Sequence, residues 1–177
     1  MKKRLLSRLV NCALVVSTLG ISTFGIVVHA QDPGAPPGIY MSEADILAKL
    51  DAAAASSASA GGWSVSISPG VSVRRRSSSV EQYAVLHPYS VEVYRILEGS
   101  GTLVTGGLLN LPLAASSDPN IVRTEQGVTG GLARRVKAGD VLVLQPGTPH
   151  YFSAIDGETI TYMESRIMIS THAIQYQ

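Results

Sequence analysis

Residues 84–106, AVLHPYSVEVYRILEGSGTLVTG, and residues 139–154, GDVLVLQPGTPHYFSA, carry the clearest structural signal in this chain. In both stretches apolar and polar residues alternate, which is the pattern of a half-buried β-strand. Glycine and proline interrupt the alternation at short intervals, as they do at turns between strands. A histidine lies beside such a turn in each stretch, His87 in the first and His150 in the second. The two segments therefore predict strands that each begin or end at a polar group.

The same alternation covers most of the chain from residue 63 onward and predicts an all-β domain. Many short strands between glycine and proline turns favour a sandwich or a closed barrel, because closure removes exposed sheet edges. We expect a loop at residues 111–120. The expected strands are residues 63–68, 71–77, 82–87, 91–97, 102–109, 121–124, 132–136, 141–144, 150–155 and 159–169.

One short helix is expected before the strands, over residues 42–55. Ser42 can cap its first turn, and Asp45 lies in that turn, where a negative charge is favourable. Ile46 and Leu50 have helical spacing on one apolar face.

The first 30 residues resemble a secretory signal peptide, with a positive start at Lys2, Lys3 and Arg4 and an apolar run over residues 13–28. Val28-His29-Ala30 suits a signal peptidase, so we expect cleavage after Ala30 and a secreted or periplasmic protein without stable membrane association. An uncleaved membrane anchor is the alternative. The expected organisation is a signal peptide at 1–30, a Pro/Gly/Ala-rich leader with the helix at 31–62, the barrel at 63–170 and a tail at 171–177.

Composition narrows the possible partners and ligands. Four of the 14 Lys and Arg residues lie in the signal segment, which leaves ten basic against 13 acidic residues, a net charge near −3 (10 − 13) and a poor match for nucleic acid. Cys12, the only cysteine, leaves with the signal. Metal ligands must then come from carboxylates and from the three remaining histidines, His87, His150 and His172.

The two opening segments resemble the two motifs of the cupin superfamily. The first motif is G-x5-H-x-H-x3,4-E-x6-G, and His87, Glu92 and Gly99 match its second histidine, its glutamate and its last glycine. The second motif is G-x5-P-x-G-x2-H-x3-N, and residues 139–150 match it from the first glycine to His150. Gln145 and Ala154 replace its proline and its asparagine.

This resemblance implies a cupin-type double-stranded β-helix, a jelly-roll barrel that commonly pairs into a homodimer. It also implies that His87, Glu92 and His150 bind a divalent metal, Fe, Mn, Zn or Ni. Val85 stands where the first motif histidine would be, so three of the usual four ligands are present. His87 and Glu92 are five residues apart, and the intervening turn at 88–90 must bring them to one face. Three protein ligands with open positions suit catalysis, and Gln82, Tyr83 or Tyr89 could add a weak fourth ligand.

Two functions follow from the resemblance. The first is a metal-dependent enzyme that acts on a small organic molecule by oxygenase, lyase or isomerase chemistry, with Tyr89 or Tyr94, or else Tyr83, as the acid/base partner. The second is a non-enzymatic module that binds a small molecule or a sugar without metal. The fold does not choose between them.

Two further features receive structural interpretations. Residues 74–76 are three consecutive arginines, and along a strand Arg75 would face away from Arg74 and Arg76. One face could meet an anionic substrate inside the barrel, but a solvated strand is the favoured interpretation. The aromatic residues Trp63, Tyr94, Phe152 and Tyr162 are expected to pack the barrel.

Overall fold

The computed structural model describes residues 36–57 and 61–169. The expected signal segment, the cleavage site after Ala30 and His172 lie outside the described residues. All described helices and strands belong to one compact unit that begins at Gly38. Among them no helix has the length and apolarity needed to cross a membrane.

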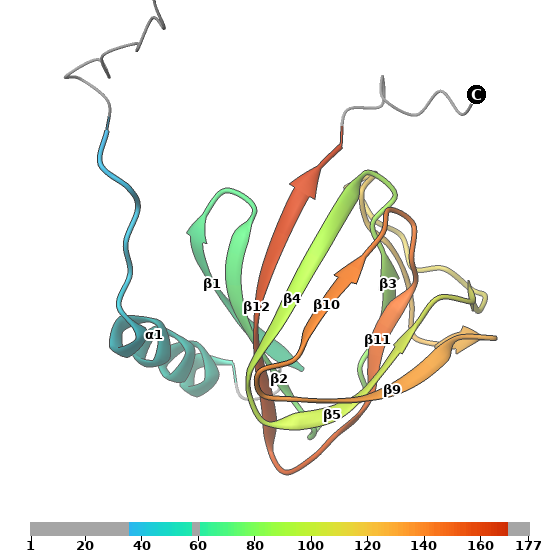
Figure 1. Ribbon diagram of the computed structural model, residues 1–177. Coiled ribbons are helices and arrows are strands. Elements are labelled where there is room, and N and C mark those ends of the chain that lie inside the picture. Colours follow the sequence, from blue (N-terminus) through green and yellow to red (C-terminus); the bar gives the residue numbers. More distant parts are fainter. Residues whose placement is uncertain (1–35, 58–60, 170–177) are drawn as a thin grey trace, which may run out of the picture. The chain divides into compact units, whose positions relative to one another are not determined.

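Two antiparallel five-stranded sheets form the body of the fold (Figure 1). The first sheet has the order β1-β2-β12-β4-β10, with β1 at Gly62–Ser68, β2 at Val71–Ser77, β12 at Thr159–Met168, β4 at Ser90–Glu98 and β10 at Val141–Leu144. The second has the order β7-β3-β11-β5-β9, with β7 at Val122–Thr124, β3 at Ala84–Leu86, β11 at His150–Ile155, β5 at Ser100–Thr105 and β9 at Leu132–Lys137. A small ribbon pairs β6, Leu108–Leu109, with β8, Val128–Thr129.

Strands that follow one another in the sequence cross from one sheet to the other. The chain crosses from β3 to β4, from β4 to β5, from β9 to β10 and from β11 to β12. Such winding builds a jelly-roll sandwich and distinguishes it from two sheets of simple hairpins. The fold is thus a cupin-like β-sandwich with one short helix, as the sequence predicted.

The tight crossing from β4 to β5 requires glycine at position 99. Gly99 has a φ of 79°, in the left-handed region that residues with a Cβ atom rarely adopt. A Cβ atom there would also lie 2.6 Å from the backbone oxygen of Thr159 on β12. The glycine that ends the first motif therefore lets β4 and β5 enter different sheets.

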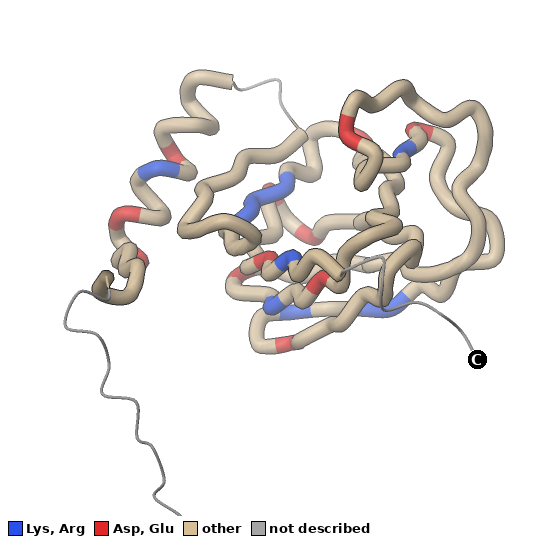
Figure 2. The backbone as a smooth tube through the Cα atoms, turned by 90° about the horizontal axis from the view of Figure 1, so that it is seen from above, with Lys and Arg blue, Asp and Glu red and all other residues tan. Residues whose placement is uncertain are grey.

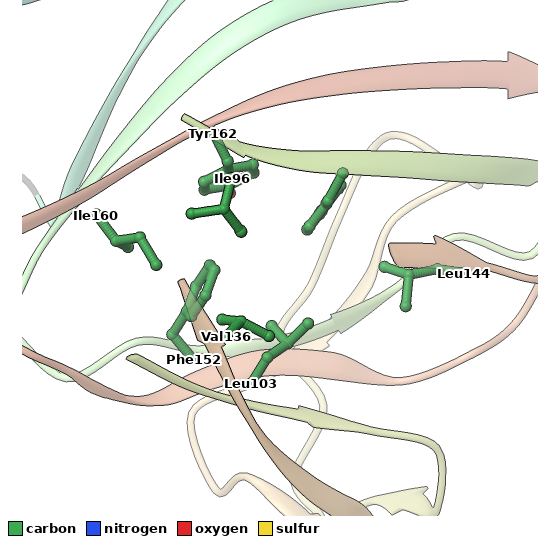
Figure 3. Close-up of a cluster of buried hydrophobic side chains, with 8 residues drawn as sticks. Ile96, Leu103, Val136, Leu144, Phe152, Ile160 and Tyr162 are labelled. Carbon is green, nitrogen blue, oxygen red and sulfur yellow. The ribbon is translucent and has the colours of Figure 1, made fainter. Parts of the chain in front are cut away.

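Apolar and aromatic side chains from both sheets fill the space between them (Figure 3). Leu103 on β5 and Ile160 on β12 are completely buried. Three of the four aromatic residues expected in the core belong to this cluster, whereas Trp63 packs in a second cluster beside the helix. The members of the main cluster are Tyr94, Ile96, Leu103, Val136, Leu144, Phe152, Ile160 and Tyr162.

The helix α1, Glu43–Ser56, packs against β1 and β2. Ser42 caps it, with its hydroxyl oxygen accepting a hydrogen bond of 3.1 Å from the backbone N–H of Asp45. Leu50 is fully buried against Val65 and Val73. Cap and apolar face thus lie where the sequence predicted them.

Two expected strands are shorter than predicted. The strand expected at 82–87 is reduced to Ala84–Leu86, because the side-chain amide of Gln82 lies within hydrogen-bond distance of three backbone carbonyls and His87 begins a turn. The strand expected at 102–109 is interrupted at Gly106 and Gly107, both with a φ of 77°. Alternation alone does not reveal either break, since local hydrogen bonds and backbone conformation cause them.

Candidate metal centre

Three elements bring His87, Glu92 and His150 together. His87 lies in the turn after β3, Glu92 is the third residue of β4, and His150 begins β11 after a Pro/Gly turn. All three side chains are at most 5% exposed. The turn at 88–89 restarts the alternation at Ser90, so that Glu92 faces the interior like His87. Such a turn was expected, because His87 and Glu92 are five residues apart and would lie on opposite faces of an unbroken strand.

Each oxygen of the Glu92 carboxylate faces one imidazole. Oε1 is 3.5 Å from Nε2 of His87, and Oε2 is 3.4 Å from Nε2 of His150. One ligand atom from each residue lies within 4.8 Å of the other two. A divalent ion about 2.1 Å from each tetrahedral ligand would space those ligands about 3.4 Å apart. The two carboxylate–imidazole distances therefore match the span of one bound ion.

Backbone carbonyls hold the outer nitrogen of both imidazoles. Nδ1 of His87 is 2.6 Å from the oxygen of Asn120, and Nδ1 of His150 is 3.0 Å from the oxygen of Thr148. A carbonyl oxygen can only accept, so each Nδ1 carries the proton and each Nε2 directs its lone pair inward. This is the arrangement in which proteins orient histidine ligands of metals.

Burial sets the charge state of the three groups. It lowers the pKa of His150 to about 4 and also lowers that of His87, where the positive charge of Arg166 adds to the effect and Glu92 opposes it. Burial raises the pKa of Glu92, against the effect of His87 and Arg166. At neutral pH both imidazoles are therefore neutral, which is the form that binds a metal.

The two tyrosines singled out in the sequence lie in different environments. The hydroxyl of Tyr94 on β4 is 3.0 Å from Nε2 of His150, and burial raises the pKa of this phenol far above its usual value. Tyr94 therefore keeps its proton and donates a hydrogen bond to Nε2 of His150. Tyr89 lies in the turn before β4 and is 39% exposed, and within the described chain no hydrogen bond joins its hydroxyl to the three candidate ligands. The structure thus places Tyr94 beside the candidate ligands and Tyr89 at the surface.

An arginine on β12 contacts the same groups. Nη2 of Arg166 is 3.0 Å from Nε2 of His87 and 2.9 Å from Oε1 of Glu92, and Nε donates to the same oxygen over 3.0 Å. The guanidinium thus neutralises Glu92 and donates to the lone pair of His87. A divalent ion fits the donor set, but it needs that single lone pair, so the hydrogen bond from Arg166 to His87 must break when metal binds.

Glu164 joins Arg166 to a second arginine. Its carboxylate is 3.0 Å from Nη2 of Arg166 and 2.8 Å from Nε of Arg74 on β2, and the residue is only 4% exposed. A buried carboxylate between two guanidiniums is well neutralised. This chain of charges holds Arg166 next to the candidate metal ligands.

These contacts correct the favoured interpretation of the three consecutive arginines, which was a solvated strand. Arg74 and Arg76 face the interior, toward Glu164 and Tyr162, whereas Arg75 faces α1 and pairs with Asp51 over 2.7 Å. The sequence predicted that Arg75 faces away from Arg74 and Arg76, but not that Arg74 and Arg76 face the interior.

Sequence reasoning also missed Glu164 and Arg166. Both continue the face of β12 that begins with the core residues Ile160 and Tyr162, because residues two apart in a strand share a face. Charged side chains in phase with core residues were the available signal. The strand predicted at 159–169 includes both residues, but charged side chains were expected to face solvent.

No family model matches the chain, and the search of curated proteins found no match. Several solved structures are similar to it. A cupin protein from Bacteroides fragilis is 17% identical, with a TM-score of 0.35 over 61% of this chain and 70% of that one. An oxalate oxidase in complex with glycolate is 20% identical, with a TM-score of 0.35 over 61% and 51%. An oxalate decarboxylase from Bacillus subtilis is 14% identical, with a TM-score of 0.33 over 56% and 23%. At these values the similarities carry no argument about function.

Proposed function

We propose that this chain is a metal-binding cupin-like protein that acts on a small organic molecule outside the cytoplasm. The observation that carries the proposal is the convergence of His87, Glu92 and His150, with both Nδ1 atoms held by carbonyls and both Nε2 lone pairs directed at one carboxylate. Extracellular or periplasmic location rests on the sequence of residues 1–30 alone.

A divalent ion at this position would supply Lewis-acid polarisation of a carbonyl, carboxylate or enol oxygen. Tyr94 has a part in such chemistry because its hydroxyl donates to His150 Nε2, which has one lone pair. When that lone pair binds a metal, the phenol must donate elsewhere, and the substrate is the available acceptor. Its raised pKa makes Tyr94 a donor to developing negative charge rather than a base.

One observation favours a second function, a binding module without metal. Arg166 already supplies Glu92 with a positive charge and His87 with a hydrogen-bond donor, which satisfies two of the three candidate ligands without an ion. In that case the imidazoles would orient a bound ligand. The metal content of the purified protein distinguishes the two functions directly, because only the enzyme needs a bound ion.

Metal analysis and thermal melting test the proposal. We expect a divalent ion to raise the melting temperature at pH 7.5 by several degrees, since a ligand at 100 times its Kd adds about 2.7 kcal/mol to the free energy of unfolding. Substitution of His150 by Ala should abolish the shift, because two remaining ligands hold an ion poorly. His172→Ala, which alters the histidine assigned to the tail, is the control and should keep the full shift.

Two outcomes would contradict the metal centre. An equal shift in wild type and in His150→Ala would mean that the ion binds elsewhere. If no metal copurifies and none alters the melting of the wild type, the binding module replaces the enzyme as the proposed function.

A further inference from the structure

Arg76 on β2 is a largely buried cation without a carboxylate partner. Its neighbours on the same strand are paired, Arg74 with Glu164 and Arg75 with Asp51. Within residues 36–57 and 61–169 no carboxylate oxygen lies within 4.0 Å of the Arg76 guanidinium. Removing an unpaired charge from water is costly, so such a group is usually neutralised by a partner or a ligand.

The protein satisfies this guanidinium poorly. Nε donates to the hydroxyl of Tyr162 and Nη2 to the hydroxyl of Tyr83, both at 3.4 Å, the long end of the hydrogen-bond range. Arginine has five N–H donors in a planar fork. Most of the donors of Arg76 thus remain available to an acceptor that the described chain does not provide.

A second arginine adds positive charge at the same place. The Cζ atoms of Arg76 and Arg123 each lie 5.4 Å from the centre of the Tyr83 ring, and the buried Nε of Arg123 has no hydrogen-bond partner among the described residues. Glu81 and Glu125 line an adjoining hollow with Tyr83, but neither lies within 4.0 Å of these two guanidiniums. Two cations therefore gather around one aromatic ring, and no described residue supplies a counterion.

A small cavity connects Arg76 with the candidate metal centre. Arg76, Gln82 and Tyr83 line it together with Tyr94 and His150, and its volume is about 20 Å³. A single water needs roughly 10–15 Å³ by this measure, so the cavity admits only a small head group. The same space thus borders an unpaired guanidinium and an imidazole of the candidate metal centre.

We propose that Arg76, supported by Tyr83 and Arg123, binds the carboxylate of a small organic acid and thereby places that acid beside His150 and Tyr94. A carboxylate is planar and accepts two parallel hydrogen bonds from one guanidinium. A neutral ligand would leave the charge of Arg76 uncompensated. Small organic acids would then be the substrate class of the proposed function, and any reaction on them rests on that proposed function. Binding of the carboxylate itself needs no metal.

Formate is the probe, and chelator-treated protein isolates Arg76 from any metal. We expect sodium formate to raise the melting temperature of the wild type above that in sodium chloride of equal ionic strength. Formamide has a similar size but no charge, and it should produce no shift. Calorimetric titration of Arg76→Met should show formate binding weakened by about tenfold or more, as expected for the loss of a charge-assisted hydrogen-bond pair.

Arg134→Met is the matched control, because Arg134 is an exposed arginine on β9. It should bind formate like the wild type. Without formate, Arg76→Met should melt no lower than the wild type, since an apolar side chain of similar volume replaces a buried unpaired charge. The wild type alone can also refute the site, because formate must stabilise it more than chloride and formamide do.

The anion site is wrong if formate stabilises the wild type no more than chloride, or if Arg76→Met binds formate as tightly as the wild type. These results leave the metal titration unaffected. Conversely, formate binding through Arg76 in a chain that binds no divalent ion would contradict the metal centre and retain the anion site.

Discussion

Glu92 is the residue around which the candidate site is organised. Its two oxygens face the two imidazoles, and Arg166 contacts one of them from β12. Because the group is 2% exposed, its charge is stable only with these partners. The contact with Arg166 shows how the described chain neutralises the Glu92 carboxylate. A bound ion would have to interact with this carboxylate more favourably than the guanidinium does.

The lowered pKa of His150 predicts how stability depends on pH. The unfolded histidine titrates near 6.5 and the folded one at about 4, so the unfolded state binds more protons between these values. The free energy of unfolding must therefore fall as pH decreases from about 6.5 toward 4, by roughly 1.4 kcal/mol per pH unit for one group. His87 shifts in the same direction, whereas the raised pKa of Glu92 acts in the opposite sense.

His150→Gln removes this contribution while keeping a polar side chain. Between pH 6.5 and pH 5, metal-free wild type should lose about 1.6 kcal/mol more stability than His150→Gln does, because the unfolded histidine is already half protonated at pH 6.5. Urea unfolding at the two pH values measures the difference. Parallel pH profiles for the two proteins would show that His150 is not buried in its neutral form.

At the scale of elements, β2 serves two environments at once. Val73 packs against Leu50 of α1, and Arg75 pairs with Asp51 of the same helix. On the opposite face, Arg74 and Arg76 reach Glu164 and Tyr162 on β12. The helix therefore covers the outer face of the strand that supplies arginines to the interior, and its packing helps to hold that strand in place.

Leu50→Ala tests the packing of α1. Leu50 is fully buried, so its truncation should cost about 2–5 kcal/mol of the free energy of unfolding. Leu47→Ala is the matched control on the same helix; Leu47 is 37% exposed, and its truncation should cost less than about 1 kcal/mol. Equal losses in urea unfolding would contradict the packing of Leu50 against Val65 and Val73.

At the scale of the whole molecule, basic and acidic residues are interspersed along the described backbone (Figure 2). The expectation that the chain does not bind nucleic acid, which rests on a charge near −3 after cleavage, stays a prediction. The interior differs, because Arg74, Arg76 and Arg166 converge there from two neighbouring strands. Glu92 and Glu164 meet these three arginines there, so that among the described residues Arg76 is the one of the three without a carboxylate partner. Pairing of two chains stays a prediction, which sedimentation at micromolar concentration can check.

The signal segment predicts a defined N-terminus. The protein recovered from the periplasm or medium should begin at Gln31, with or without cyclisation of that glutamine, because Val28-His29-Ala30 suits the peptidase. Intact-mass measurement gives the result directly. A full-length chain found in the membrane fraction would instead support an uncleaved anchor and would contradict the proposed location.

The sequence by itself predicted the two-sheet fold, most strand positions, the capped helix and the convergence of His87, Glu92 and His150. These depend on short-range signals: a period of two, turn residues, a cap and two motifs with fixed spacing. Gly99 and the turn before Ser90 could be recognised from the sequence for the same reason, because each changes the direction of the chain only at its immediate neighbours.

Only the tertiary structure decided which face of β2 is interior and which charges meet there. Arg74 and Arg76 lie some 90 residues from Glu164 and Tyr162 in the sequence and become neighbours through the pairing of β2 with β12. The alternation states that residues two apart share a face, but it does not state what covers that face. Because α1 covers one face of β2 and the barrel interior the other, the arginines became buried cations. Such partners depend on strand order, which no local pattern contains.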